Sequence, residues 1–483
     1  MSQEKSGVQI SQKAFFQAVA IIFALMLFAG VLTRIVPAGQ YTRIQVEGRM
    51  EVIDPSSFTL TERPNYPIWR WFTAPFEIFV AEGNTTVIGI ILFIVLVGVA
   101  FAVMDRSGIL TYAIQRIVQR FSHRKYLLML VLTFFFMSLG GFFGILEEVV
   151  PLVPIIIALS YSLGWDSLTG LGISILATNV GFSTAVFNFF TIGTAQRLAG
   201  LPLFSGWGPR LVLFFVAYVI LSIFLVSYAK RIERQPEKSP VYPEDQPERA
   251  KYKTFKLEAS VNRLQMNRAL IFMAVFFVLI LAAVMTLSWI ESLNDLAMPL
   301  SGLLFVIGGL GAALLAGIGK DIWKAMRDGF LGMAPAIPLL MMAASVRHIV
   351  ASGGILDTIL HWASNLFSNT TPFVSSLVIY ALTLILELFI TSGSAKALLV
   401  IPILMPLADI VHVNRQIAIS AYCFGDGFSN LVYPTNALLL ITLSLTVVPY
   451  HKWLRWVLRL WPWIILATVI FLAIAVSTNY GPF

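Results

Sequence analysis

Residues 138–148 place three glycines and two adjacent carboxylates inside an otherwise apolar region of the sequence. The apolar runs on either side, 127–137 and 149–159, are each about half as long as the roughly 20 residues that a helix needs to cross a bilayer. Irregular backbone survives at membrane depth only where it is buried in protein or lines a wet cavity. We therefore expect a re-entrant hairpin with its tip at the glycines. Two spanning helices joined by a water-exposed turn are the alternative.

The overall composition is that of a membrane protein. Hydrophobic residues make up 58% of the 483 residues and charged residues only 12%, against about a quarter charged in soluble proteins. The long apolar blocks favour helices over the alternating segments of about ten residues found in membrane barrels. The net charge of +8 reflects Lys and Arg gathered in loops, so we expect a lipid bilayer and no nucleic acid as partner. The chain is predicted to be an all-α polytopic membrane protein.

Sequence motifs of enzymes and ATP-driven pumps are missing. No Gly-x-x-x-x-Gly-Lys-Ser/Thr motif is present to cradle phosphates, and no His-Glu-x-x-His is present to bind zinc. Cys423 is the single cysteine, which excludes an internal disulfide and a thiol cluster for a metal. We therefore expect a protein that is not an enzyme and that carries no cofactor.

Polar segments divide the chain into two halves, 14–229 and 269–477, joined by a cytoplasmic linker over 230–268. A cytoplasmic N-terminus (1–13) and a short C-terminal tail (478–483) flank them. Each half is expected to hold one re-entrant hairpin and one broken transmembrane helix: hairpins near 126–163 and 373–411, and broken helices at 167–200 and 416–448. If hairpins do not count as crossings, about nine crossings are predicted, with the N-terminus inside the cell and the C-terminus outside.

Short matches at an offset of 246 residues indicate an internal repeat. The tripeptide at 108–110 recurs at 354–356, and that at 181–183 recurs at 427–429. An odd number of crossings separates the equivalent segments, which predicts two inverted repeats. Inverted repeats with Gly-interrupted apolar segments are typical of secondary transporters whose site lies near the membrane midplane.

The hairpin tips and helix breaks offer hydroxyls, amides and backbone groups that can bind a polar metabolite and a small ion together. Candidate substrate ligands are Gly140, Gly141, Glu147, Glu148, Asn188, Ser392, Gly393, Ser394, Lys396, Asp426, Asn430 and Thr435. Because hard cations take oxygen ligands, candidate sodium ligands are Asn179, Gly181, Ser183, Asp426, Ser429 and Asn430. The alternative is that these small and polar residues only pack helices closely together.

Ionisable residues deep in apolar runs are expensive and point to function. Here they are Glu147, Glu148, Glu387, Asp426 and Lys396. Lys396 is expected either to pair with an acid or to bind a substrate carboxylate. Four acids against one base favour a cation: sodium, a proton or a basic amino acid. Asp166, near a predicted helix end, is expected to be solvated.

Several ordered segments carry a family resemblance over nearly the whole chain. They are 36–41 (VPAGQY), 140–148, 188–196, 392–394 and 425–435. At these residues the chain resembles the YfcC family, within the anaerobic dicarboxylate carrier group of the ion-transporter superfamily. The resemblance implies scaffold and transport domains that move as an elevator, and four-carbon dicarboxylates or arginine and ornithine as substrates. Phe189 and Lys396 depart from the family's pattern, in which proline and a neutral residue are usual.

These observations predict a secondary active transporter, either a symporter or an antiporter, in the bacterial inner (cell) membrane. Its substrate is expected to be a small amino acid or carboxylate metabolite, preferably a basic amino acid such as arginine or ornithine. Sodium or a proton is the candidate coupling ion, and a homodimer is the candidate assembly. The alternatives are a sodium- or proton-coupled four-carbon dicarboxylate transporter and, in another class, a passive channel or a non-transporting membrane scaffold.

Overall fold

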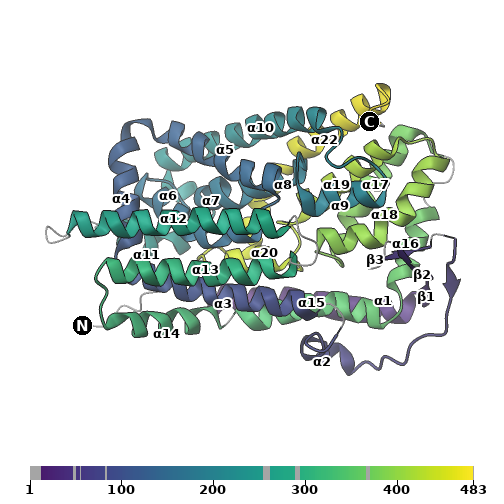
Figure 1. Ribbon diagram of the computed structural model, residues 1–483, viewed down its shortest axis with the longest axis horizontal. Helices are drawn as coiled ribbons and strands as arrows, with labels where there is room; N and C mark the ends of the chain where they lie inside the picture. The colour runs from purple at the N-terminus through teal and green to yellow at the C-terminus, as the bar shows by residue number, and fades with distance from the viewer. Residues whose placement is uncertain are drawn as a thin grey trace.

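The chain forms a bundle of helices in two packed groups, seen in the computed structural model of Figure 1. The structure describes residues 12–46, 50–54, 56–81, 84–253, 262–288, 294–334, 336–365 and 370–481. The expected helical membrane class is confirmed by long apolar helices in both groups.

The first group contains helices that pack along the lower side and across the middle of Figure 1. Its members are α1 (Gln12–Ile35), α2 (Arg70–Glu77), α3 (Asn84–Arg106), α12 (Arg263–Ser288), α13 (Asn294–Leu315), α14 (Asp321–Met333) and α15 (Ala336–Ser352). Helix α3 packs on α13 and α14, α12 packs on α13, and α1 packs on α15. Helices α4 (Ile109–Phe121) and α16 (Leu356–Asn365) follow α3 and α15 as short apolar-faced helices.

The second group holds the segments that interrupt the apolar runs. From the first half come α5 (Lys125–Phe143), η2 (Glu147–Leu152), α6 (Val153–Ser162), α7 (Ser167–Leu171), η3 (Gly172–Leu176), α8 (Ala177–Thr184), η4 (Phe189–Gly193), α9 (Thr194–Leu198) and α10 (Trp207–Arg234). From the second half come α17 (Pro372–Leu386), α18 (Gly393–Ile410), α19 (Arg415–Ser429), α20 (Ala437–Ser444), α21 (Tyr450–Val457) and α22 (Trp461–Ser477). Helix α8 packs on α5, and α19 packs on both α17 and α8.

Helix length alone supports fewer crossings than about nine. Among the described residues, four helices are long and apolar enough to span a membrane: Lys125–Phe143, Trp207–Arg234, Arg263–Ile280 and Asp321–Ser352. Two bent pairs raise the number to six if each is a single span, with bends of 73° between α3 and α4 and 46° between α21 and α22. The crossing number, the inverted repeats and the orientation stay predictions.

The region between α1 and α3 departs from the expected all-α class. Strands β1 (Gly39–Gln40) and β4 (Thr59–Leu60) pair antiparallel, as do β2 (Arg43–Val46) and β3 (Met50–Ile53). The register sets Gly39 opposite Leu60 and Arg43 opposite Ile53. Asp357 of α16 accepts hydrogen bonds from the Tyr41 N–H at 2.9 Å and from Arg43 at 3.3 Å. This carboxylate therefore ties the strands to the helical bundle.

The structure places the helix breaks at residues with special backbone conformations. Helix α5 continues through Gly140 and Gly141 and ends at Gly144, whose φ of 68° suits a residue without a side chain. Pro151 then lies inside η2, and Pro154 lies in the first turn of α6, where a missing N–H is tolerated. Helix α8 ends at Ala185, which has a φ of 49°.

The linker between the two halves contains a helix that contacts both of them. It forms η5 (Pro236–Lys238) and α11 (Tyr242–Lys253). The buried Asp245 of α11 accepts hydrogen bonds from the Tyr161 hydroxyl at 2.8 Å and from the Ser167 hydroxyl at 2.7 Å. Glu244 pairs with Lys452 of α21 at 2.6 Å. Helix α11 therefore connects the hairpin region of the first half to the second half.

The expectation that Asp166 is solvated is wrong, because its side chain is fully buried. Asp166 caps α7 by accepting the Thr169 N–H at 2.8 Å, and it also accepts the hydroxyls of Tyr228 at 2.6 Å and Ser239 at 2.7 Å. Burial raises the pKa of the neighbouring Asp245 to about 7, and the Asp166 carboxylate adds to this effect. Asp166 does lie at a helix end, as predicted, but Ser239 of the linker packs over that end.

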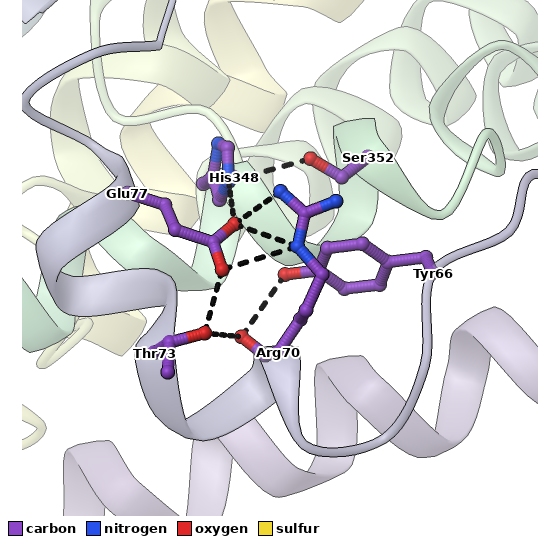
Figure 2. A network of polar contacts seen from close by, with 6 residues as sticks. All are labelled: Tyr66, Arg70, Thr73, Glu77, His348 and Ser352. Atoms are coloured by element: carbon purple, nitrogen blue, oxygen red, sulfur yellow. Dashed lines mark hydrogen bonds and ion pairs between the residues drawn. The ribbon is translucent and has the colours of Figure 1, made fainter.

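Helix α2 is held against α15 by a network of polar contacts (Figure 2). The Arg70 guanidinium pairs with the Glu77 carboxylate at 2.6 Å, and the Thr73 hydroxyl donates to Glu77 at 2.6 Å. The His348 ring of α15 meets the same carboxylate at 3.1 Å. Partial burial acts to raise the pKa of Glu77, but hydrogen bonds from Arg70, Thr73 and His348 outweigh it and lower the pKa to about 2.

Replacing Glu77 by glutamine is expected to lower the apparent melting temperature at pH 7, by the equivalent of about 1 kcal/mol. The folded state depresses this pKa, so the stabilisation is present above the ordinary value of 4.5 and is lost as the pH falls toward about 2. The melting difference between wild type and variant should therefore shrink between pH 5 and about pH 3. Glu62→Gln, at an exposed site in the same region, is the control. Equal stability of Glu77→Gln and wild type at pH 7 would contradict the assignment.

Candidate transport site

Three buried ionisable side chains meet where the second interrupted segment contacts a broken helix. Glu387 follows the last residue of α17, Lys396 lies in the first turn of α18, and Asp426 lies near the end of α19. The Lys396 ammonium contacts the Glu387 carboxylate directly and donates to Asp426 Oδ1 at 2.8 Å. None of the three side chains is more than 1% exposed. Pairing with acids, one of the two roles considered for Lys396, is present in the structure, and the other role stays untested.

Two asparagines extend this cluster to the second helix break. Asn436 Nδ2 donates to Asn430 Oδ1 at 3.0 Å and to Glu387 Oε1 at 3.4 Å. Asn436 Oδ1 accepts the Leu438 N–H at 2.9 Å, so the same side chain caps α20. Asn436 is absent from the sequence-based candidates. Its position directly before an apolar run is a helix-start signal that could have identified it.

Some buried oxygen atoms in the cluster and at the two helix breaks lack hydrogen bonds. Within the described part of the chain, Asp426 Oδ2, Thr435 Oγ1 and Asn179 Oδ1 have no hydrogen-bond partner. A Cβ placed on Gly393 would lie only 3.1 Å from Asp426 Oδ2. The Tyr422 hydroxyl donates to the Gly393 carbonyl at 2.9 Å and holds the start of α18 beside Asp426. Because buried acceptors normally have donors, these oxygens are suited to a ligand that donates hydrogen bonds.

The formal charges of the cluster leave one negative charge in excess. Glu387 and Asp426 contribute two carboxylates, and Lys396 contributes one ammonium. Charges in a desolvated environment need partners, because an unpaired buried charge is costly. The arrangement is therefore chemically matched to one additional monovalent cationic group that donates hydrogen bonds.

Several candidate glycines lie at close helix crossings. A Cβ on Gly140 would lie 2.0 Å from the Thr178 carbonyl oxygen, and one on Gly181 would lie 1.9 Å from the Met137 carbonyl oxygen. A Cβ on Gly141 would meet the Phe214 ring at 2.9 Å. These glycines allow α5 to approach α8 and α10 closely, as in other membrane helix pairs. Their predicted roles in binding a substrate or an ion stay untested.

The polar candidates at the breaks bond mostly to nearby backbone. Ser183 donates to the Asn179 carbonyl at 2.6 Å, and Ser429 donates to the Gly425 carbonyl at 2.7 Å. Asn188 accepts the N–H groups of Phe190 and Thr191 at 3.0 and 3.3 Å, which orders the segment between α8 and η4. The hydroxyl oxygens keep lone pairs, so a role as ion ligands stays a prediction.

Other candidates are placed less completely. The side chains of Glu147, Glu148 and Ser394 lie outside the described residues. Ser392 lies just before α18, and its carbonyl accepts the Lys396 N–H at 2.9 Å. The structure thus brings together Gly393, Lys396, Asp426 and Asn430 with Glu387 and Asn436.

Side chains cap the exposed carbonyls at both helix breaks. In the first half, the fully buried Arg210 donates to the carbonyls of Ala185 at 2.9 Å and Val186 at 3.3 Å. In the second half, the carbonyls 246 residues later are those of Leu431 and Val432. They accept Trp453 Nε1 at 2.9 Å and the Tyr450 hydroxyl at 2.6 Å. The protein therefore satisfies these backbone groups without an ion.

Arg210 also has no counterpart among the sequence-based candidates. It lies in the first turn of α10 and donates to the Ser205 carbonyl at 3.0 Å and toward the Tyr480 hydroxyl at 3.4 Å. A charge at the start of a long apolar helix looks like an interfacial residue in the sequence. In the tertiary structure, the break at 185–186, the segment at 204–205 and Tyr480 surround it.

Comparison with known proteins gives consistent matches across the chain. The family model described as "C4-dicarboxylate anaerobic carrier" (DcuC) matches residues 15–477. The chain is 32% identical over 470 residues to YfcC of Escherichia coli (strain K12), which is named provisionally as a basic amino acid antiporter; the match covers 90% of this chain and 91% of YfcC. It is 23% identical over 503 residues to a protein of Haemophilus influenzae whose name states no function, covering 96% and 97% of the two chains.

Two solved transporter structures were also matched. The YdaH transporter of Alcanivorax borkumensis has a TM-score of 0.42 and 15% identity, covering 97% of this chain and 100% of that one. MtrF of Neisseria gonorrhoeae, described within a class of antimetabolite efflux pumps, has a TM-score of 0.41 and 16% identity, covering 98% and 96%. The matched family model and the Escherichia coli relative are described as a carrier and an antiporter rather than as enzymes.

Proposed function

The chain belongs to the family of C4-dicarboxylate anaerobic carriers, and on that premise we propose that it exchanges basic amino acids as a secondary active antiporter. The observation that carries the substrate class is the buried cluster of Glu387, Lys396 and Asp426, with one negative charge in excess. A guanidinium or ammonium group of arginine, ornithine or lysine would supply the missing positive charge. It would also donate hydrogen bonds to the unpartnered Asp426 Oδ2.

The amino acid's own carboxylate needs a separate partner. The start of α18 at Gly393 presents backbone N–H groups, and a helix N-terminus attracts negative charge. The side-chain cation would then lie toward Asp426, and the α-carboxylate would lie at the start of α18. YfcC, named as a basic amino acid antiporter, is consistent with this choice through its 32% identity.

The arrangement of helices supports transport by two related halves. Helix α5 packs on α8 in the first half, and α17 packs on α19 in the second half. A Cβ on Gly427 of α19 would lie 2.4 Å from Ser183 Cα of α8, so the two broken helices cross at residues of the matching tripeptides. The capped carbonyls at 185–186 and 431–432 repeat the offset of 246. We therefore retain two inverted repeats with an elevator-type movement in a multi-pass inner-membrane carrier.

A four-carbon dicarboxylate is the second candidate substrate, and the family description favours it. Its two negative charges would add to the excess already present at the cluster. Such a substrate would require accompanying sodium ions or protons. The charge count therefore favours the basic amino acid.

The deciding measurement is a thermal-shift series on the purified carrier. Arginine, ornithine and lysine should raise the apparent melting temperature, because a ligand that binds the folded state stabilises it, by about 2.7 kcal/mol at a hundred times its Kd. Succinate and fumarate should not. Labelled arginine should enter proteoliposomes saturably, and only when they are loaded with a basic amino acid. Stabilisation by succinate alone would overturn the substrate class, and unsaturable flux would indicate a channel.

A further inference from the structure

We propose that the ammonium of Lys396 is a resident counter-cation that takes the place of a coupling sodium ion, so that this carrier works without sodium. This inference concerns the same site and rests on the proposed transport function, but not on which metabolite is carried. In this proposal Lys396 has the role of the coupling cation and does not bind a substrate carboxylate.

The position of Lys396 is unfavourable for a cation except for its two partners. The residue lies in the first turn of α18, where the helix presents its partial positive end. The side chain is fully buried, so water cannot solvate the ammonium. The charge is held by Glu387 on one side and by Asp426 Oδ1, at 2.8 Å, on the other. Each carboxylate therefore gives one oxygen to this cation.

The groups around the ammonium are those that would bind sodium in its absence. Sodium is a hard cation and takes carboxylate, amide and carbonyl oxygens as ligands. The Glu387 and Asp426 carboxylates converge on one point, and Asn430 Oδ1 is joined to the same network through Asn436. A tethered ammonium supplies the same single positive charge and three hydrogen-bond donors. Because it is covalently attached, it is present in every turnover.

The resident charge also sets the condition for movement through the membrane. With both carboxylates ionised and Lys396 in place, the empty cluster would carry one net negative charge, which is costly in a low-dielectric environment. A bound cationic group brings the cluster to neutrality. The loaded carrier can then cross more easily than the empty one, which favours exchange of one basic molecule for another.

Removing the ammonium should create a requirement for sodium. Lys396→Ala leaves two buried carboxylates and a space beside them, so sodium should now stabilise the purified variant in the absence of any amino acid. Exchange by the variant should be stimulated about tenfold or more when sodium replaces choline at constant ionic strength. Wild-type melting temperature and exchange should not respond to the same replacement.

Matched variants separate this effect from general damage. Lys452→Ala removes a lysine that pairs with Glu244 at 2.6 Å, away from the cluster, and should stay insensitive to sodium. Lys396→Ala combined with Asp426→Asn should lose the sodium response, because it removes a ligand of the created site. If Lys396→Ala cannot be purified, radioactive sodium binding to the wild type gives the answer, and no saturable binding is expected.

The inference is overturned if wild-type exchange requires sodium, if wild type binds sodium saturably, or if folded Lys396→Ala exchanges substrate without a sodium response. These results do not depend on substrate identity. A carrier that prefers succinate but ignores sodium would refute the proposed substrate and leave the role of Lys396 intact. A sodium-dependent arginine exchanger would support the proposed substrate and refute the role of Lys396.

Discussion

Asp426→Asn is expected to reduce basic amino acid exchange by about a hundredfold or more while leaving the protein folded. Asp426 provides one oxygen to Lys396 and a second, unpartnered oxygen to the site. Asparagine has nearly the same shape, but it removes the negative charge that attracts a cationic substrate. Loss of one partner in a buried charge pair costs about 2–5 kcal/mol of binding. Lys396 keeps its ion pair with Glu387, so the buried ammonium still has a partner in the variant.

The measurement is counterflow of labelled arginine in proteoliposomes, with the arginine thermal shift as the binding readout. Both signals should be lost together in Asp426→Asn. Asp409→Asn is the control, because Asp409 is exposed near the end of α18 and pairs with the exposed Arg415 at the start of α19. If Asp426→Asn retains arginine exchange close to that of wild type, Asp426 is not part of the site.

Arg210→Met is expected to cause the largest loss of stability among the substitutions considered, equivalent to about 2–4 kcal/mol. The change leaves the carbonyls of Ala185 and Val186 without this donor and removes one of the two side-chain donors to the Ser205 carbonyl, which keeps Gln196. Each buried polar group left unsatisfied costs about 1–3 kcal/mol, partly offset because a buried charge is also removed. Methionine retains much of the volume, so cavity formation contributes little.

The test is the apparent melting temperature of Arg210→Met in detergent. It is compared with that of the same substitution at a second arginine of α10. Arg231 lies on the same helix but is exposed, and Arg231→Met should change the melting temperature little. Arg210→Lys should recover part of the loss, since an ammonium can donate to some of the same carbonyls. Equal melting temperatures for Arg210→Met and Arg231→Met would show that the cap at the helix break contributes no stability.

The membrane class and the places where helices are interrupted are local properties of the sequence. Apolar run length, composition and the glycine and proline positions determine them, because a helix in lipid must satisfy its backbone within its own segment. The break after Gly144 and the segment between Glu387 and Gly393 fall within segments that the sequence marked as interrupted. The family resemblance could also be recognised in the sequence, because its motifs are short, local and occur in a fixed order along the chain.

The composition of the site depends on contacts between distant segments. Lys396, Glu387 and Asp426 were recognisable as buried ionisable residues, but nothing local indicated that the lysine contacts both acids rather than a substrate. Asn436 joined the site only because α20 begins beside Glu387. Small displacements of helix crossings change such partners, and the crossings themselves depend on glycines such as Gly427 that allow close approach.

By itself, the sequence determined that this chain is a helical membrane carrier with interrupted helices and ionisable residues at depth. Only the tertiary structure decided which charges neutralise one another and which polar groups are already satisfied. Asp166 illustrates the difference: its place at a helix end is local information, whereas its burial follows from packing of the linker helix. Charge pairing and solvation depend on which residues are neighbours in three dimensions. These neighbours come from segments that are far apart in the chain.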